Sequence, residues 1–387
     1  MSAEITNATP LEEEVAAQKL PDADQLANRF ALCPRDHEAS AERHAEVMEK
    51  LDFGRACGDY MAVARWTPQD GWVDKKVEAY GPLALSPAAA VFHYAQEIFE
   101  GLKAFRRADG SIWCFRPGFN AARFNQSARR MAMPELDVWD FVGSLVTTVR
   151  ADKRWVPGGE NTSLYLRPFM IADEEFLGVH TALQYRYVLI TSPVGPYFKD
   201  GVAPVSIWVS TDYHRAAPGG TGDAKTGGNY AASLLPQQMA AERGYEQVLY
   251  LDAKTSTNLE ELGGMNVFVV RADGTVQTPR LTGTILEGGT RGALIQLMED
   301  RGITVDQVDI ALADLLDDIA SGQVTEMFAC GTAAVITPIC QLGGEIDGAE
   351  FEVTLEGTEL AMVLLAEMTG IQRGTVPDPH NWMYRLA

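Results

Sequence analysis

Short segments of alternating or mainly apolar residues recur along the first half of the chain, and this pattern predicts β-strands. The predicted strands cover residues 60–66, 102–106, 112–116, 163–171 and 185–193. Ala108-Asp109-Gly110 separates the second of these segments from the third, and Asp-Gly between two strands is typical of a β-hairpin. Apolar residues at helical spacing predict helices at 117–131 and 135–155. The first half is therefore expected to mix helices and strands.

The second half of the chain combines further strands and helices. Strands are predicted at 205–210, 247–252, 266–271 and 324–329, and helices at 229–243, 288–299, 312–321 and 358–369. A cluster of chain-breaking residues, from Pro193 to Gly201, separates the two halves and is typical of a linker. We expect a mobile acidic tail at 1–25, a small α/β domain at 26–193, an interdomain loop at 194–201 and a large domain at 202–387.

Composition and charge narrow the class of protein. The proportions of 46% hydrophobic and 22% charged residues are those of an ordinary globular protein. A formal net charge of -21 disfavours nucleic acid and anionic membrane as partners, because both repel a polyanion. Five scattered cysteines without a C-x-x-C pair favour neither a disulfide framework nor a zinc site. We therefore expect no metal site. The N-terminus shows no signal-peptide pattern, so we expect a cytoplasmic protein.

Three loops rich in Gly and Thr, at 218–230, 281–291 and 330–334, carry the candidate chemistry. The first loop holds Lys225 among small residues, where desolvation would lower the pKa of the amine and make it nucleophilic, as a Schiff-base lysine requires. The other loops hold Gly288-Gly289-Thr290, at the start of a predicted helix, and Gly331-Thr332. Their backbone N–H groups suit a phosphate. Together, the three loops favour a pyridoxal-phosphate (PLP) site.

Two other interpretations of Lys225 stay open at this point. Most lysines are solvated surface charges. The loop also approaches the phosphate-binding pattern G-x-x-x-x-G-K-[ST] of nucleotide hydrolases, from Gly219 to Thr226. However, Ala224 replaces the second glycine of that pattern, and no Walker B strand follows, which makes a nucleotide hydrolase the weaker alternative.

Six segments resemble the branched-chain aminotransferases of PLP fold type IV and occur in the order of that family. They are His93–Arg106, Tyr165–Pro168, Gly195–Tyr197, Lys225–Tyr230, Glu261–Asn266 and Gly331–Ala334. The resemblance implies a two-domain α/β (α+β) fold like that of D-amino-acid aminotransferase, with PLP as the cofactor. It also implies transfer of the amino group of L-leucine, L-isoleucine or L-valine to 2-oxoglutarate, which gives branched-chain 2-oxo acids and L-glutamate.

The same resemblance implies a role for each matching residue. Lys225 matches the lysine that binds the cofactor covalently and moves the proton. Tyr230 matches the tyrosine that meets the cofactor O3′, and Glu261 the glutamate that faces the pyridine nitrogen. The remaining cofactor contacts, mostly to the phosphate, would come from Arg123, Leu286, Gly289, Thr290 and Thr332. The substrate would contact Phe99, Tyr94, Tyr165, Arg167, Tyr197, Thr332 and Ala333.

Two of these residues carry further expectations. Tyr94 resembles a residue that reaches into the site of the other subunit, so a homodimer is expected. Arg167 lies two positions after Tyr165 and so on the same face of its predicted strand, where its guanidinium would meet the γ-carboxylate of glutamate. The alternative for Arg167 is a structural salt bridge. Rival functions are a D-amino-acid aminotransferase or lyase of the same fold, and a binding protein that has lost the cofactor.

Some positions depart from the family pattern. Gly264 and Glu287 stand where some relatives carry threonine and proline. Certain animal members have a C-x-x-C after the Gly-Thr-Ala turn, and here those positions are Ala334 and Thr337. We therefore expect no thiol switch at this turn.

Overall fold

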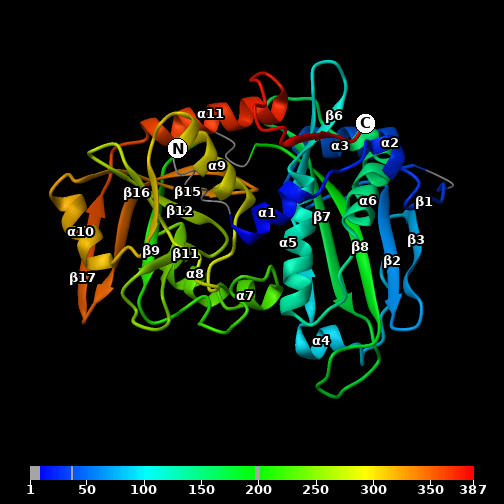
Figure 1. Cartoon of the computed structure of the whole chain (residues 1–387), viewed down its shortest axis with the longest axis horizontal. Coiled ribbons are helices and arrows are strands. Elements are labelled where there is room, and N and C mark those ends of the chain that lie inside the picture. Colours follow the sequence, from blue (N-terminus) through cyan, green and yellow to red (C-terminus); the bar gives the residue numbers. More distant parts are fainter. Residues whose placement is uncertain (1–8, 36–37, 197–200) are drawn as a thin grey trace, which may run out of the picture. The chain divides into compact units, whose positions relative to one another are not determined.

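The computed structural model describes residues 9–35, 38–196 and 201–387, which form two compact units (Figure 1). The first unit comprises Met1–Pro196 with Gln372–Gly374 and Asp378–Ala387, and the second comprises Tyr197–Ile371 with Thr375–Pro377. The C-terminal residues thus return to the first unit, whereas the sequence predicts that they stay in the second domain. Within the described residues, no helix has the length and apolar character needed to cross a membrane.

A nine-stranded, mainly antiparallel sheet forms the first unit, in the order β1-β3-β2-β8-β7-β5-β6-β18, with β4 paired to β7. The predicted hairpin is confirmed, because β5 and β6 pair antiparallel with Phe105 opposite Trp113. The strands are β1 Ala31–Leu32, β2 Tyr60–Thr67, β3 Gly71–Ala79, β4 Glu97–Phe99, β5 Leu102–Arg106, β6 Ile112–Phe115, β7 Ser163–Ala172, β8 Tyr185–Val194 and β18 Met383–Arg385.

Helices α5 and α6 pack against one face of this sheet and bury the core of the unit, in which Phe124, Phe141 and Tyr187 contact one another. The predicted helix at 117–131 is confirmed. The helix predicted at 135–155 starts later, because the Asp137 side chain caps it by accepting two backbone N–H groups. The helices are α1 Pro10–Ala17, α2 Ala23–Leu26, α3 Ala41–Lys50, α4 Ala90–Tyr94, α5 Pro117–Arg130 and α6 Val138–Ala151, followed by a 3₁₀ turn at Lys153–Trp155.

The segment expected to be a mobile tail forms α1 and α2 instead. Leu11, at the start of α1, is 3% exposed and packs with Phe119 and Ala122 of α5. Leu26 joins the main core of the unit. Two leucines in an otherwise acidic segment therefore anchor it, because each buries an apolar side chain, and Glu12 adds an ion pair with Arg116 of the first unit.

The second unit contains another nine-stranded sheet, in the order β11-β10-β9-β16-β15-β12-β13-β14, with β17 paired to β16. Strand β9 runs parallel to both of its neighbours. Its strands are β9 Val205–Ser210, β10 Gln247–Leu251, β11 Leu259–Leu262, β12 Asn266–Arg271, β13 Val276–Pro279, β14 Val305–Val308, β15 Val324–Gly331, β16 Val335–Ile346 and β17 Ala349–Thr354. The four strands predicted here are confirmed to within two residues at their ends.

Helices of the second unit are α7 Gly227–Ala231, α8 Leu234–Glu242, α9 Gly289–Asp300, α10 Leu312–Ala320 and α11 Glu359–Arg373. The prediction of one helix at 229–243 is wrong, because the chain forms α7 and α8 with a break at 232–233. Pro236 lacks an N–H and would interrupt a continuous helix. In the first turn of α8 that missing donor costs nothing, since the first N–H groups of a helix have no internal partner.

Candidate active site

Lys225 lies in the loop between β9 and α7, and its amine meets the phenol of Tyr230. The Lys225 Nζ donates a hydrogen bond to Tyr230 Oη at 2.6 Å. The same Nζ lies 5.1 Å from the centre of the Tyr230 ring. Both side chains are half-buried. The turn from the loop into α7 thus brings together two of the residues that the sequence singles out.

Asn229 holds the lysine loop in shape. Its Nδ2 donates to the carbonyls of Thr221 at 2.7 Å and Ala224 at 2.9 Å, while its Oδ1 accepts the Thr221 hydroxyl at 2.7 Å. The asparagine side chain is buried. The sequence analysis gave Asn229 no role, although an asparagine among small residues is a common source of such backbone bonds.

Two of the Gly/Thr-rich loops touch each other through their backbones. A Cβ added to Gly222 would lie 2.3 Å from the Thr284 carbonyl oxygen and 2.5 Å from the Thr284 Cα. Such distances exclude any side chain at Gly222. The loop at 281–291 is tied in turn to β12, because Asn266 Nδ2 donates to the Leu286 carbonyl at 3.0 Å.

Glu261 lies on β11 and is 3% exposed. Arg215 Nη2 contacts Glu261 Oε1 at 2.5 Å, and the Leu286 N–H donates to the same oxygen at 2.7 Å. Burial raises the pKa of Glu261 to about 7, although Arg215, the Leu286 N–H and Lys225 each oppose this rise. The carboxyl group is therefore buried but directly paired. Arg215 is a further residue of this cluster that the sequence analysis did not identify.

The other two loops present backbone N–H groups at a helix start and a strand turn. Gly288 precedes α9, and Gly289 and Thr290 are the first two residues of that helix, whose N–H groups point out of its N-terminal end. Thr332 and Ala333 lie in the turn between β15 and β16. The predicted phosphate contacts of these residues stay predictions. The Leu286 N–H donates to Glu261 Oε1, and the predicted contact of Leu286 with the phosphate also stays a prediction.

Phe99, Tyr165 and Arg167 form a cluster in the first unit, on the sheet face opposite α5 and α6. The Arg167 guanidinium carbon lies 4.8 Å from the centre of the Phe99 ring and 5.2 Å from that of Tyr165. Arg167 Nη2 donates to Tyr165 Oη at 2.9 Å. The buried Arg167 Nε has no hydrogen-bond partner among the residues that the structure describes. Tyr165 and Arg167 share a face of β7 as the strand pattern predicts, and Phe99 of β4 joins them.

Arg123 occupies a different environment in the same unit. Its Nε and Nη2 pair with the two oxygens of Glu100 at 2.7 and 2.9 Å, and both side chains are buried. Asn120 Nδ2 donates to the same carboxylate at 2.7 Å. This bidentate pair links α5 to the residue after β4. The predicted contact of Arg123 with the cofactor phosphate stays a prediction.

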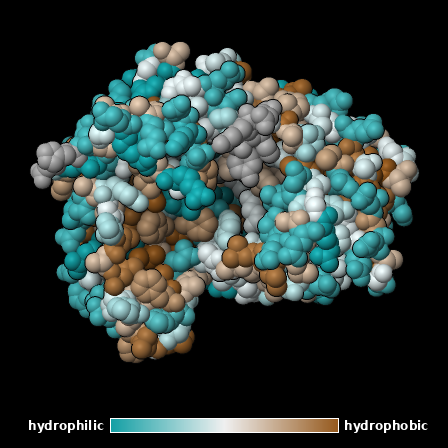
Figure 2. All heavy atoms as spheres, turned by 180° about the vertical axis from the view of Figure 1, so that it is seen from behind, coloured by the Kyte–Doolittle hydropathy of each residue, from teal (hydrophilic) through white to brown (hydrophobic). Residues whose placement is uncertain are grey.

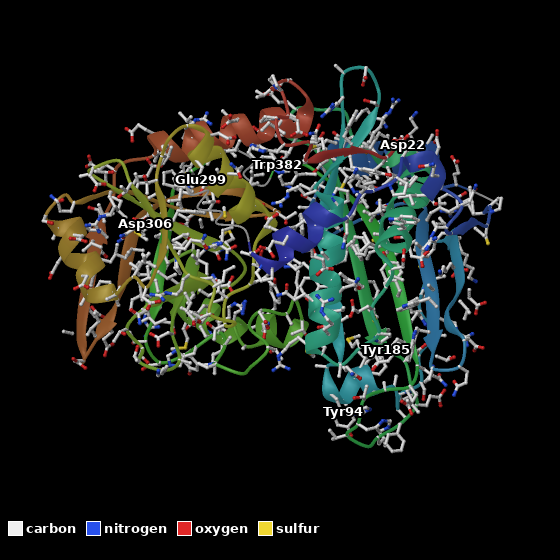
Figure 3. All side chains as sticks on the ribbon, viewed as in Figure 1. Asp22, Tyr94, Tyr185, Glu299, Asp306 and Trp382 are labelled. Carbon is white, nitrogen blue, oxygen red and sulfur yellow. The ribbon has the colours of Figure 1, made fainter. Side chains whose placement is uncertain are left out.

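Tyr94 ends α4, and its hydroxyl donates to the Leu177 carbonyl of the same chain (Figure 3). The side chain is 37% exposed. Its predicted reach into a second subunit stays a prediction. Tyr197, the remaining predicted substrate contact, lies outside the described residues.

The family model described as "Amino-transferase class IV" matches residues 97–342. The branched-chain-amino-acid aminotransferase of Mycobacterium tuberculosis (strain ATCC 25618 / H37Rv) is 49% identical over 365 residues, which cover 93% of this chain and 98% of that protein. A probable branched-chain-amino-acid aminotransferase of Streptomyces coelicolor is 50% identical over 361 residues, with 92% and 98% covered.

Solved structures agree with these matches. The crystal structure of the Escherichia coli branched-chain amino acid aminotransferase has a TM-score of 0.69 and 24% identity, and the alignment covers 85% of this chain and all of that one. The enzyme of Thermoproteus uzoniensis, solved with norvaline, has a TM-score of 0.67 and 25% identity, with 84% and 100% covered.

The fold and the matching family model define a class IV aminotransferase of PLP fold type IV, as predicted. Within that class, the chain belongs to the branched-chain-amino-acid aminotransferases. The expectations of a transaminase with PLP as its cofactor are confirmed at the level of this family.

The residues of the second unit fit such a cofactor. All described hydrogen bonds to Glu261 fall on Oε1, so Oε2 is left as an acceptor for the pyridine nitrogen. The amine of Lys225 donates to the phenol of Tyr230, and an amine in a pocket of small residues suits a nucleophile. The start of α9 offers N–H donors and a positive helix end to a phosphate.

Proposed function

We propose that the protein transfers the amino group of L-leucine, L-isoleucine and L-valine to 2-oxoglutarate. The observation that carries this proposal is the Arg167 cluster, in which a guanidinium lies on two aromatic rings and keeps a buried Nε without a partner among the described residues. The rings offer an apolar wall to a branched side chain. The guanidinium offers a charge-assisted bond to the γ-carboxylate of glutamate.

Lys225 is proposed as the residue that holds the cofactor and moves the proton. Bound PLP supplies the electron sink that makes the α-proton of the amino acid acidic. The Lys225 amine would take this proton as a general base and return it as a general acid. Tyr230, whose Oη lies 2.6 Å from Nζ, would hold the amine in position. Glu261 would accept the N–H of the pyridine ring and so favour its protonated form.

Borohydride reduction followed by peptide mapping tests the first of these roles. The reduced cofactor should be found on Lys225. A label on another lysine would overturn the assignment.

Glu261→Gln should retain PLP but remove the α-proton of leucine much more slowly, because a neutral amide favours a protonated ring less than a carboxylate does. An unchanged single-turnover rate would refute the role of Glu261.

The role of Arg167 is tested by measuring the two half-reactions separately in a stopped-flow instrument. Arg167→Met removes the charge but keeps an apolar side chain, so the glutamate half-reaction should slow by roughly ten- to a hundred-fold more than the leucine one. Arg65→Met is the matched control, because Arg65 belongs to the same unit and forms an exposed ion pair with Asp74. Equal losses for leucine and glutamate would assign Arg167 to the fold instead.

The active unit is proposed to be a homodimer, and an exposed apolar cluster on the first unit supports this. Around α4 and the loop after β7, Phe92, Phe176, Leu177, Val179 and Leu183 are all exposed, and Val179 is 86% exposed. Figure 2 shows apolar surface gathered on the first unit. An apolar patch of this kind marks an interaction surface. Sedimentation that revealed a fully active monomer would overturn both the dimer and the role of Tyr94.

A cytoplasmic location is also proposed. Its support is the set of five cysteines, described as free thiols, which fit a reducing compartment. Fractionation of the producing cells would test it, and recovery of the protein outside the cytoplasm would contradict it.

A further inference from the structure

Arg215 links the two parts of the site that handle the cofactor. It lies ten positions before Lys225, and its side chain is 5% exposed. Its Nη2 contacts Glu261 Oε1 at 2.5 Å, and the same guanidinium donates to the Gly222 carbonyl at 3.0 and 3.4 Å. One buried cation therefore touches both the carboxylate on β11 and the loop that carries Lys225.

We propose that Arg215 is a positioning residue for the cofactor, which fixes Oε1 of Glu261 and favours the ionised carboxylate, so that Oε2 accepts the pyridine N–H. This inference rests on the proposed role of Glu261. One oxygen, Oε1, both pairs with Arg215 Nη2 and accepts the Leu286 N–H, so two contacts from different elements hold that end of the carboxylate. No described hydrogen bond reaches Oε2.

The charges around Glu261 show why its ionisation needs a partner. Burial, with a smaller contribution from the neighbouring carboxyl of Glu260, raises the pKa of Glu261 to about 7. Arg215 has the largest lowering effect, followed by the Leu286 N–H and Lys225. Without Arg215 the pKa of Glu261 would rise further, which favours the protonated carboxyl. A protonated carboxyl can donate to the ring nitrogen, but it no longer favours a pyridinium.

Other charged and titratable groups do not replace Arg215. Arg291, the other guanidinium that Glu261 influences, donates to the Pro279 carbonyl and to the Gln307 side chain. Cys330 is buried, and burial raises the pKa of its thiol to about 12, so it is neutral at physiological pH.

The experiment compares Arg215→Met, Arg215→Lys and Glu261→Gln in the full-length holoenzyme. The first readout is the ¹⁵N NMR shift of PLP labelled at the pyridine nitrogen, recorded against pH. The second is the rate of PLP dissociation after dilution into a scavenger. Arg280→Met is the matched control, because Arg280 belongs to the same unit and forms an exposed ion pair with Asp309.

In the wild type and in Arg280→Met, the nitrogen should be protonated at pH 7.5. Arg215→Met should move its signal towards that of Glu261→Gln and speed PLP loss by roughly ten- to a hundred-fold, as expected when a charge-assisted bond is removed. Arg215→Lys keeps the positive charge, so the ¹⁵N signal should resemble that of the wild type. PLP should leave somewhat faster, because a lysine ammonium lacks the planar fork with which the guanidinium contacts both Glu261 and the Gly222 carbonyl.

The two proposals fail in different ways. A wild-type nitrogen signal in Arg215→Met, combined with an altered one in Glu261→Gln, would overturn the role of Arg215 alone. An unaltered signal in Glu261→Gln would overturn the role of Glu261 and the inference with it. If Arg215→Met does not fold, Arg215→Lys decides, because a signal like that of Glu261→Gln would show that the positive charge is not what holds the nitrogen protonated.

Discussion

Gly222→Ala should damage the site more than any other single methyl group added to the lysine loop. The new Cβ would lie 2.3, 2.5 and 2.6 Å from the carbonyl oxygen, Cα and carbonyl carbon of Thr284. All three are backbone atoms, so no flexible side chain can move aside. The loop that carries Lys225 would have to separate from the loop at 281–291, and the Gly222 carbonyl would move away from Arg215.

Overpacking of this kind costs about 1–3 kcal/mol, and a collision with backbone belongs at the upper end. For a unit of this size, about 3 kcal/mol corresponds to a fall in the unfolding midpoint of roughly 6–12 °C. Gly228→Ala is the matched control in the same segment. Gly228 lies in α7, is exposed and has no atom within 4 Å of an added Cβ. Alanine there should be neutral or stabilise by up to about 1 kcal/mol.

Calorimetry of the cofactor-free protein measures both variants against the wild type, and titration with PLP follows. We expect Gly222→Ala to unfold at a clearly lower temperature and to bind PLP more weakly. If Gly222→Ala and Gly228→Ala unfold at the same temperature, the stability of the two loops does not depend on this close approach.

Three further predictions concern stability and redox behaviour. Burial raises the pKa of Asp252, but bonds from three backbone N–H groups and a hydroxyl outweigh it and lower the pKa to about 2. Since this is below the unfolded value of 3.8, the stabilisation is full above about pH 4 and is lost as the pH falls towards 2. Asp252→Asn should therefore melt below the wild type at pH 7, and this gap should narrow between pH 4 and pH 3. Mild peroxide should form no Cys330–Cys340 disulfide, as checked by mass spectrometry. Cys330 lies opposite Ile336, and Cys340 is four residues further along β16, or roughly 13 Å away at 3.3 Å per residue, which is too far for a disulfide. Leu11→Ala should lower the free energy of unfolding of the first unit by about 2–3 kcal/mol in denaturant titrations, whereas exposed Leu32→Ala should not.

Local patterns in the sequence predict those parts of the site that are close in the chain. Lys225 and Tyr230 are five positions apart, and the turn into α7 brings them into contact. Tyr165 and Arg167 share a face of β7 because side chains alternate along a strand, and the structure confirms that they touch. In both cases the spacing along one element fixes the geometry.

The strand that carries Glu261 illustrates what the pattern hides. Leu259-Glu260-Glu261-Leu262 places two carboxyl groups in the middle of a four-residue strand, and charged residues are rarely fully buried. Hydrophobic periodicity therefore gives no strand there. The strand forms because it pairs with β10. Glu260 and Glu261 can be buried because Thr284 and Arg215, which are distant in sequence, bond to them.

Two arginines of the first unit show why a motif match alone does not distinguish structural from functional charge. Arg123 is paired through Nε and Nη2 with the buried carboxylate of Glu100, so its guanidinium already has a structural role. Arg167 lies on aromatic faces with a buried Nε that has no partner among the described residues. A substrate carboxylate would satisfy that donor at no cost to an existing ion pair of the described residues. The difference arises from the neighbours of each guanidinium, and it makes Arg167 the stronger candidate for recognising a second carboxylate.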